Sequence, residues 1–373
     1  MELKAIISGG GTAGHINPAL AIAGHLEKYH NAEILFVGTP TGMESTLVPK
    51  AGYPMETVVV EGLIRKLTFK NVKVLYHFIK AVSDAKKIIR KFGPDIVIGT
   101  SGYVCAPVMV AAHKLGIPTL IHEQNVIPGF TVKLTASIVD AIAISFSDTT
   151  KYFKPKVAEK CFLTGNPLRE NMLDISYEEA RARLELDLRP FVVALGGSLG
   201  ARAVNQAVAE YINSVDASKV QVLAATGKRY YDEFMGQVDK EKLSDSIRVE
   251  PYIYNMEEVL PAADVVIARA GALTIGELTA LGRPSILIPS PNVAHDHQTY
   301  NAKSLASAGA AVLIPESELS AEKLKKEIDG LLSDEQKREE MSKNAKKLGI
   351  TDGAKRIAAR VCELIKSKAE IRL

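Results

Sequence analysis

Short runs of apolar residues alternate with longer amphipathic stretches along most of this chain. The first run is Lys4–Ser8, and a glycine-rich loop and an amphipathic stretch from about Pro18 to Tyr29 follow it. The run has the length and β-branching of a buried strand, while Asn17 and Pro18 suit the N-cap and first residue of a helix. Three more strands are predicted in this half, over Glu33–Val37, Asp95–Gly99 and Pro118–His122. Strands that alternate with helices indicate parallel βαβ units.

The same pattern restarts in the second half of the chain. Pro190–Leu195 is another buried apolar run, a second glycine loop covers Gly196–Ala201, and a helix follows to about Asn213. Later strands are predicted over Val220–Ala224, Arg248–Tyr252, Asp264–Ala268, Ser285–Pro289 and Ala311–Ile314. The final stretch is helical only, with breaks near Ser333 and Asp352. We therefore expect an α/β protein with two Rossmann-like, doubly wound parallel-sheet domains that face each other across a cleft.

The length of 373 residues agrees with two domains. We place the first over residues 1–165 and the second over 166–350, with a terminal helix over 351–373 that returns to the first domain. Charged residues make up 24% and hydrophobic residues 47% of the chain, which excludes a disordered or fibrous protein. The chain contains no apolar run long enough to cross a bilayer and no signal-peptide pattern at its start. A net charge of +3 is too small to indicate a nucleic-acid partner.

The three cysteines, Cys105, Cys161 and Cys362, are widely spaced and match no metal-binding motif. We interpret them as reduced thiols of a cytoplasmic protein.

One segment, Leu63–Lys91, is strongly basic. From Arg65 onward it contains nine lysines and arginines but only one acid, Asp84, and large apolar residues are interleaved with the cations. This composition suits contact with an anionic membrane surface, where apolar side chains enter the interface and cations meet phosphates. A solvated helix that packs its apolar side on the sheet has the same composition, so the residues leave both interpretations open.

The first glycine loop matches the pattern Gly9-x-Gly11-x-x-Gly14 of dinucleotide-binding proteins. That pattern also needs an acid at the end of the second strand to hold a ribose, and here the strand ends at Phe36–Thr39. An NAD site is therefore disfavoured, while a general anion site at a helix N-terminus remains. His15 lies just before the predicted helix, where the positive helix end favours a neutral imidazole. It is either a general base toward a hydroxyl or a loop histidine bound to backbone.

Several other polar groups follow predicted strands. Ser198 in the second glycine loop suits a phosphate, and Arg169 at the domain join suits a diphosphate. Thr274-x-x-Glu277 has the spacing of a capping box, which the residues alone favour over a ribose contact. His295 and His297 are two residues apart, a spacing that would let both bind a metal ion from one face of a strand. A polar loop that contacts substrate hydroxyls is the better interpretation. No Asp-x-Asp pair occurs, so we expect no metal site.

Six motifs occur in a familiar order. They are Gly9–Pro18 (GGGTAGHINP), Gly99–Gly102 (GTSG), His122–Asn125 (HEQN), Gly165–Arg169 (GNPLR), Gly196–Ala201 (GGSLGA) and Ala268–Glu277 (ARAGALTIGE). With them the chain resembles, over essentially its whole length, the bacterial peptidoglycan glycosyltransferases of family 28, which have the two-Rossmann GT-B fold. Each glycine loop alone is a weak signal, and the ordered set is a strong one.

The resemblance implies transfer of GlcNAc from UDP-GlcNAc to the C4 hydroxyl of MurNAc-pentapeptide on undecaprenyl diphosphate. This step converts lipid I to lipid II with inversion at the anomeric carbon. It also implies a peripheral protein at the cytoplasmic face of the bacterial cell membrane, which favours membrane contact by Leu63–Lys91. It implies no cofactor and no nucleic-acid partner.

The resemblance also assigns site residues. His15 is the candidate base, and Thr12, Ala13, Gly14 and Asn125 close over the donor sugar from the first domain. Ser198 and Arg169 hold the diphosphate, Ile253 pairs uracil through its backbone, and Glu277 binds ribose. The remaining substrate-binding residues are Ala272, Leu273, Thr274, Ile275, Gly276 and Gln298. The family often has two glutamines where this chain has His297-Gln298, which leaves the role of His297 open.

Other functions remain as alternatives. A sugar-nucleotide 2-epimerase or a diacylglycerol glycosyltransferase would keep the fold, and an epimerase would turn over UDP-sugar without an acceptor. An NAD-dependent oxidoreductase lacks the strand-end acid. A non-catalytic membrane scaffold would leave both glycine loops unexplained.

Overall fold

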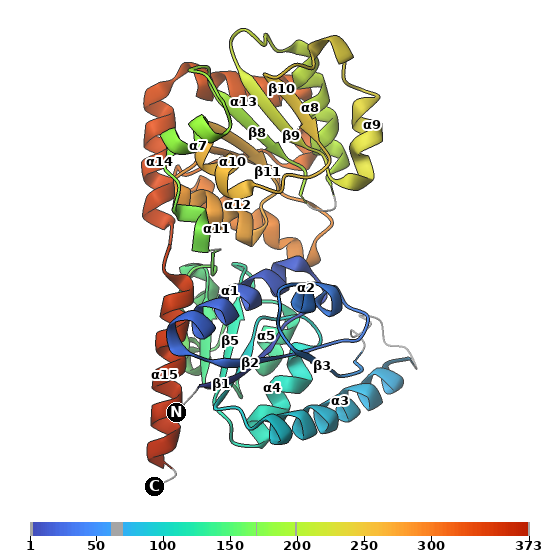
Figure 1. The fold of residues 1–373 in the computed structure, drawn as a ribbon, viewed down its shortest axis with the longest axis vertical. Helices are drawn as coiled ribbons and strands as arrows, with labels where there is room; N and C mark the ends of the chain where they lie inside the picture. The colour runs from blue at the N-terminus through green and yellow to red at the C-terminus, as the bar shows by residue number, and fades with distance from the viewer. Residues whose placement is uncertain (1–2, 61–69, 169, 198–199, 372–373) are drawn as a thin grey trace. The chain divides into compact units, whose positions relative to one another are not determined.

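Parallel strands form two separate sheets in the computed structural model, which describes residues 3–60, 70–168, 170–197 and 200–371. The chain divides into two compact units (Figure 1). The first unit is Met1–Leu168 with Thr351–Leu373, and the second is Arg169–Ile350. The chain thus passes into the second unit after Leu168 and returns to the first at Thr351 for its last helix.

The sheet of the first unit has the strand order β3-β2-β1-β4-β5-β6-β7 among the described residues. Its strands are β1 (Lys4–Ser8), β2 (Glu33–Gly38), β3 (Met55–Thr57), β4 (Ile96–Gly99), β5 (Thr119–Glu123), β6 (Ala141–Ile144) and β7 (Cys161–Leu163). The helices are α1 (Ala13–His30), α2 (Glu44–Lys50), α3 (Lys70–Phe92), α4 (Cys105–Lys114), α5 (Phe130–Thr135), α6 (Pro155–Ala158) and α15 (Gly353–Ile371), with a 3-10 turn η1 (Ser147–Tyr152). The order reverses between β1 and β4, and such a reversal is where α/β sheets bind ligands.

The sheet of the second unit repeats this plan with the order β10-β9-β8-β11-β12-β13. Its strands are β8 (Phe191–Leu195), β9 (Gln221–Ala225), β10 (Ile247–Glu250), β11 (Val265–Ala268), β12 (Ser285–Leu287) and β13 (Val312–Leu313). The helices are α7 (Tyr177–Arg183), α8 (Arg202–Ser214), α9 (Tyr231–Met235), α10 (Met256–Ala262), α11 (Ala272–Leu281), α12 (His297–Ala306), α13 (Ala321–Ser333) and α14 (Glu335–Leu348). Short 3-10 turns are η2 (Glu170–Leu173), η3 (Lys228–Tyr230), η4 (Lys240–Lys242), η5 (Ala294–Asp296) and η6 (Glu316–Glu318). Here the order reverses between β8 and β11, so both units are the predicted doubly wound sheets.

Both faces of the first sheet are covered, because successive side chains of a strand point to opposite faces. Ala5 and Ile7 of β1 are buried in one apolar cluster, while Ile6 is buried in the other. The first cluster includes residues of α1 and α15, and the second includes residues of α3 and α4. Figure 1 shows α15 alongside α1, so the end of the chain completes the core of the first unit.

The prediction for the start of α1 was wrong. The helix begins at Ala13, with Thr12 in extended conformation (φ −143°, ψ 154°) as its N-cap, and Pro18 lies inside it. Asn17 and Pro18 therefore do not open the helix, and His15 lies in its first turn rather than before it. Proline is tolerated here at the cost of one helical hydrogen bond, because the buried face of α1, which includes Pro18 itself, packs on the sheet.

Strands β3, β6 and β7 were not predicted. β3 and β7 are three residues each, and β6 is a run of four. Runs this short carry little hydrophobic pattern, so neighbouring strands rather than local sequence decide their conformation.

The packing of α15 gives a test of the fold. Ile357 is fully buried between α15 and the sheet, so Ile357→Ala should destabilise the first unit by about 2–4 kcal/mol. Thermal unfolding should show a lowered midpoint, whereas Lys366→Ala, at an exposed position of the same helix, should leave it unchanged. Equal midpoints for the two variants would contradict a structural role of α15 in the first unit.

Candidate functional site

Two loops meet at the carboxyl end of the first sheet, where the strand order reverses. The loop after β1 contains Gly9–Thr12, and the loop after β4 contains Thr100–Val104. The Thr100 hydroxyl donates to the carbonyl of His15 at 2.8 Å, and a Cβ on Gly102 (φ +90°) would lie 2.3 Å from the carbonyl oxygen of Gly10. Contact this close is possible only between backbones, so the GTSG motif fixes the course of the first glycine loop.

His15 has a defined tautomer in this arrangement. Its Nδ1 lies 2.9 Å from the carbonyl oxygen of Gly10 and 3.3 Å from Oγ1 of Thr12. Because a carbonyl oxygen only accepts, Nδ1 carries the hydrogen and the lone pair of a neutral ring is on Nε2. The first turn of α1 contains no acidic residue, and its positive end favours the neutral ring. His15 is thus oriented as a general base can be, with Nδ1 anchored.

Glu44, at the start of α2, is a buried carboxylate that the sequence did not reveal. One oxygen accepts from the Gly11 amide at 2.9 Å, and the other accepts from the Thr39 amide and hydroxyl at 3.0 and 2.6 Å. Burial would raise the pKa of Glu44, but the hydrogen bonds from Thr39 and Gly11 outweigh it and the pKa is lowered. The Gly11 amide is therefore committed to a carboxylate and not to a ligand phosphate, which argues further against a dinucleotide site.

The HEQN motif ends β5 at the same edge of the sheet. His122 is fully buried, Nε2 contacts the Gly165 carbonyl at 3.2 Å, and burial lowers its pKa to about 4. Glu123 accepts from the amides of Asn125 and Gly129 at 2.9 and 2.7 Å. Asn125 is the one residue of the HEQN motif that is partly exposed, and Glu123 holds its backbone in place.

The second unit has a comparable glycine loop between β8 and α8. Gly200 (φ +79°) lies against Tyr230, since an added Cβ would be 2.4 Å from the ring and 2.6 Å from the Thr226 carbonyl oxygen. Asn205 of α8 donates to the same Thr226 carbonyl at 2.8 Å. Ser198 and Arg169, the residues predicted to hold the diphosphate, lie outside the described residues.

The capping-box interpretation of Thr274 and Glu277 was wrong. The N-cap of α11 is Gly271, so Thr274 and Glu277 both lie within the helix rather than at its boundary. Spacing alone does not show which residue has the extended backbone of an N-cap. Both side chains are partly exposed, and so are Leu273 and Gly276. Ile275 and Ala272, by contrast, are buried.

The remaining predicted residues of this unit, Ile253 and Gln298, lie in the loop after β10 and in the helix α12 that follows β12. Ile253 has a buried side chain between the exposed Tyr252 and Tyr254. Gln298, in the first turn of α12, accepts from the Ser290 amide at 2.9 Å. His295 and Asp296 before it both have positive φ, 56° and 52°, a strained conformation that clusters at functional sites. His295 and His297 therefore lie in a turn and a helix, not on one strand face.

The described residues of the predicted site thus follow the carboxyl ends of strands in both sheets. Thr12, Ala13, Gly14 and His15 follow β1, and Asn125 follows β5, in the first unit. Ile253, the Ala272–Glu277 segment and Gln298 follow β10, β11 and β12 in the second.

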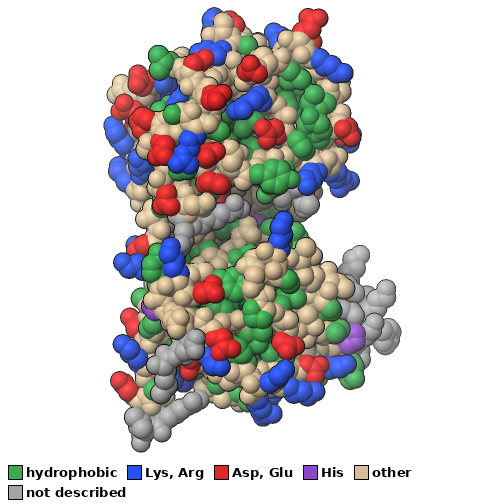
Figure 2. Space-filling view, in the orientation of Figure 1, with side chains coloured by type: hydrophobic (Ala, Val, Ile, Leu, Met, Phe, Trp, Pro, Cys, Tyr) green, Lys and Arg blue, Asp and Glu red, His purple; other side chains and the backbone are tan. Residues whose placement is uncertain are grey.

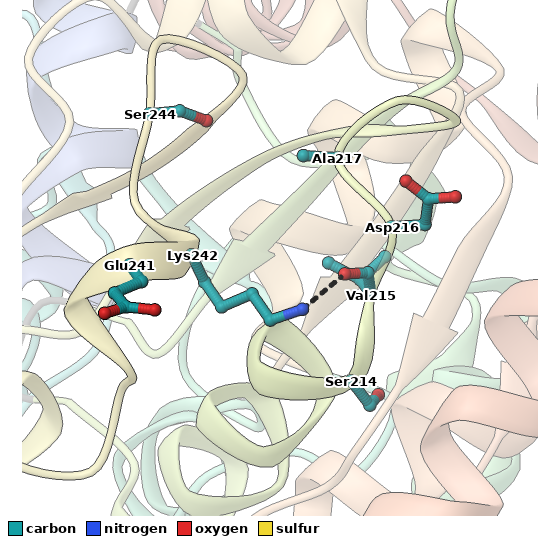
Figure 3. A pocket seen from close by; sticks show the side chains of 7 residues that line it. All are labelled: Ser214, Val215, Asp216, Ala217, Glu241, Lys242 and Ser244. Carbon is teal, nitrogen blue, oxygen red and sulfur yellow. Dashed lines mark hydrogen bonds between the residues drawn. The ribbon is translucent and has the colours of Figure 1, made fainter.

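Two other features bear on ligands. Within the described part of the chain, no group of three or more His, Cys, Asp or Glu residues is placed to hold a metal ion. A hollow in the second unit lies at the end of α8, where Lys242 donates to the Val215 carbonyl at 3.4 Å (Figure 3). None of the predicted site residues lines this hollow, so it does not belong to the candidate site.

The basic segment forms α3 from Lys70 onward, and its residues 63–69 lie outside the described residues. Val82, Ala85 and Ile89 pack in the core, whereas Leu75, Tyr76 and Ile79 are 58–63% exposed. Figure 2 shows several Lys and Arg side chains, together with some Asp and Glu, along the edge that α3 forms. No described helix has the length and hydropathy needed to cross a membrane.

Comparison with known proteins identifies relatives along the whole chain. The models of the glycosyltransferase family 28 N-terminal and C-terminal domains match residues 5–144 and 191–357. A UDP-N-acetylglucosamine–N-acetylmuramyl-(pentapeptide) pyrophosphoryl-undecaprenol N-acetylglucosamine transferase of Alkaliphilus oremlandii is 45% identical over 368 residues, 98% of this chain and 100% of the relative. The protein of the same name from Acetivibrio thermocellus is 46% identical over 370 residues, again 98% and 100%.

Solved structures agree with this family. The crystal structure of Acinetobacter baumannii MurG has a TM-score of 0.78 and 28% identity, covering 97% of this chain and 99% of that one. A UDP-GlcNAc 2-epimerase from Neisseria meningitidis has a TM-score of 0.68 at 12% identity, covering 97% and 100%. The latter likeness shows the shared GT-B fold alone.

Glu123 gives a pH test of the first unit. Burial raises its pKa to about 6 despite the hydrogen bonds of Asn125 and Gly129, from an ordinary value of 4.5. The folded state therefore binds this proton more tightly than the unfolded chain. Its stabilising contribution is complete below pH 4.5 and is lost as the pH rises through 6.

We expect the stability of the wild type relative to Glu123→Gln to fall by about 2 kcal/mol between about pH 4 and pH 7. Chemical denaturation at several pH values measures this difference. A difference that stays constant over that range would show that Glu123 has an ordinary pKa.

Proposed function

Because the chain belongs to glycosyltransferase family 28, we propose that it transfers GlcNAc from UDP-GlcNAc to the MurNAc-pentapeptide carried on undecaprenyl diphosphate. The acceptor is the C4 hydroxyl of the muramoyl sugar, and the step converts lipid I to lipid II in peptidoglycan synthesis. The observation that carries this proposal is the similarity at about 45% identity, over nearly the full chain, to transferases of that name. The two doubly wound units and the MurG structure support it.

In this proposal the second unit binds the donor nucleotide. Ile253 pairs uracil through its backbone, Glu277 accepts from the ribose hydroxyls, and Gln298 contacts the GlcNAc. Oε1 of Gln298 already accepts from the Ser290 amide, which fixes the Gln298 side chain in one orientation. The diphosphate is held by Ser198, Arg169 and the positive N-terminus of α8, whose first turn contains no acid. The negative charge that develops on departing UDP is stabilised by these same groups, without a metal ion.

The first unit supplies the base. The C4 oxygen of the acceptor attacks the anomeric carbon of GlcNAc while the bond from that carbon to UDP breaks on the opposite face. Nε2 of His15 takes the C4 proton as the new glycosidic bond forms. A single displacement of this kind inverts the anomeric carbon and needs no nucleophilic side chain. Thr12, Ala13, Gly14 and Asn125 bind the donor sugar from this unit.

We also propose that the protein is peripheral at the cytoplasmic face of the membrane, which it contacts through Leu63–Lys91. The exposed Leu75, Tyr76 and Ile79 lie on the same helix as the exposed Lys80 and Lys87. Apolar side chains that stay in water on a cationic helix are favoured at an anionic lipid surface.

The reaction is tested by incubating the protein with UDP-GlcNAc, with and without a lipid I analogue. We expect UDP release that depends on the acceptor and a β1,4-linked disaccharide product. Turnover of UDP-GlcNAc without acceptor would indicate an epimerase or hydrolase, and donor binding without turnover on lipid I would direct the search to other lipid acceptors.

His15→Ala tests the base. We expect kcat to fall by about 10²–10⁴-fold while the affinity for UDP-GlcNAc changes little. His113→Ala, at an exposed position of α4, serves as the control and should leave kcat unchanged. Near-normal turnover of His15→Ala with intact donor binding would exclude His15 as the base.

Membrane contact is tested by flotation with vesicles that contain anionic phospholipid. The double variant Leu75→Ser and Ile79→Ser should lose most of its vesicle binding but retain turnover of a water-soluble acceptor analogue. Tyr29→Ser removes an equally exposed aromatic side chain from α1 and should bind as the wild type does. Unchanged binding of the double variant would rule out α3 as the contact.

A further inference from the structure

One peptide group in the first glycine loop is hydrogen-bonded at both of its ends. The peptide joins Gly10 to Gly11. Its carbonyl oxygen accepts from Nδ1–H of His15 at 2.9 Å, and its N–H donates to Oε2 of Glu44 at 2.9 Å. A carboxylate, a peptide and an imidazole therefore form one continuous chain of hydrogen bonds.

At the carboxylate end of this hydrogen-bond chain, the surroundings of Glu44 stabilise its negative charge. Glu44 is fully buried, yet Thr39 donates two hydrogen bonds to its other oxygen, and these bonds together lower its pKa so that it is ionised near neutral pH. A Cβ on Gly10 or on Gly42 would lie 2.3–2.7 Å from carboxyl atoms of Glu44. The backbone thus passes the carboxylate at a distance that only glycine permits, and the charge stays next to the peptide.

A carboxylate that accepts from the N–H of an amide pushes electron density toward the carbonyl oxygen of the same amide. Hydrogen bonds in series strengthen one another in this way, the more so in a low-dielectric interior. The Gly10 oxygen becomes a stronger acceptor for Nδ1–H, which stabilises the imidazolium that forms when Nε2 takes a proton. Carboxylate groups that bind the Nδ1 side of a catalytic histidine directly have the same effect.

We propose that Glu44 is a positioning residue for His15, and that it acts through the Gly10–Gly11 peptide group to fix the tautomer of the imidazole and raise its basicity. The inference rests on the proposed function only in so far as His15 is the base of the transfer. The positive end of α1 by itself makes His15 a weaker base, and the effect of Glu44 opposes this.

The other titratable groups around the loop act less directly. Among the described residues, Tyr103 of the loop after β4 packs near Gly11, and Glu123 of β5 accepts from the Gly129 amide. Neither is hydrogen-bonded to the Gly10–Gly11 peptide in the structure. Among the described residues, Glu44 is therefore the carboxylate that can act on His15 through this peptide.

The test is NMR of the full-length protein with ¹⁵N-labelled histidine. The spectrum of His15→Gln assigns the signals of His15 among the eight histidines. In the wild type we expect the Nδ1–H tautomer. In Glu44→Gln, whose amide has one accepting oxygen for the donors of both Thr39 and Gly11, we expect the pKa of His15 to fall by about 0.5–1 pH unit. The acidic limb of the kcat–pH profile should shift by the same amount, with KM for UDP-GlcNAc unchanged.

Two further variants separate the proposed route from simpler effects. Asp95→Asn removes a partly buried carboxylate that accepts from the Lys4 amide at the other end of β1, and it should leave His15 unchanged. Glu44→Asp keeps the charge but shortens the side chain by one methylene, so it should behave like Glu44→Gln. A His15 pKa in Glu44→Asp equal to that of the wild type would show that charge alone matters and would overturn the peptide route.

An Nε2–H tautomer in the wild type would also overturn the proposal, and this measurement needs only the assignment variant His15→Gln and no variant of Glu44. The NMR results do not require turnover. A protein that transfers no sugar but shows the His15 shift would refute the proposed function and leave this inference intact.

Discussion

The approach of two backbones at the carboxyl end of the first sheet is the constraint on which the candidate site depends. The carbonyl of Gly10 lies where a side chain at Gly102 would be, and the Thr100 hydroxyl binds the carbonyl of His15. With α2 on the other side, Glu44 takes the amide of Gly11. The loop is thus held from both sides, and His15 has little freedom to turn. A side chain held in this way loses little conformational entropy when its partner arrives, which is a condition for efficient proton transfer.

The glycine loop of the second unit is also held by close packing, but different charges lie beside it. Its glycine loop packs on Tyr230 and the Thr226 carbonyl, as the first packs on Thr100 and Gly102. What differs is the charge beside the loop. In the first unit a carboxylate occupies the Gly11 amide, which disfavours a phosphate there, whereas Lys228 and Arg229 follow β9 beside the second loop. The two loops look alike in sequence, yet among the described residues a carboxylate lies beside the first and two cations follow the strand beside the second. This asymmetry agrees with a donor nucleotide in the second unit and a base in the first.

Much of this could be predicted from the sequence, because buried parallel strands and glycine loops leave local signals. Lys4–Ser8 was predicted to the residue, and the terminal helices break near the predicted positions. The start of α1 was missed, since Pro18 suggested a first helical residue while packing on the sheet carried the helix past it. Glu44 was missed for a different reason. Its role depends on α2 folding back onto a loop more than thirty residues earlier, and the only local trace is the glycine pair Gly38 and Gly42 around Thr39.

Two buried carboxylates in the first unit show how burial and hydrogen bonding compete. Glu44 and Glu123 are both almost inaccessible, and each accepts from two backbone amides. Glu44 has in addition the short bond from the Thr39 hydroxyl, and its pKa is lowered, whereas burial raises the pKa of Glu123 to about 6. Near pH 6 the two groups therefore differ in charge: Glu44 keeps the Gly10–Gly11 peptide polarised, while Glu123 is half protonated and its hold on Asn125 weakens. On the proposed function, the charge next to the segment that binds the donor sugar thus changes near pH 6, while the carboxylate that supports the base stays ionised.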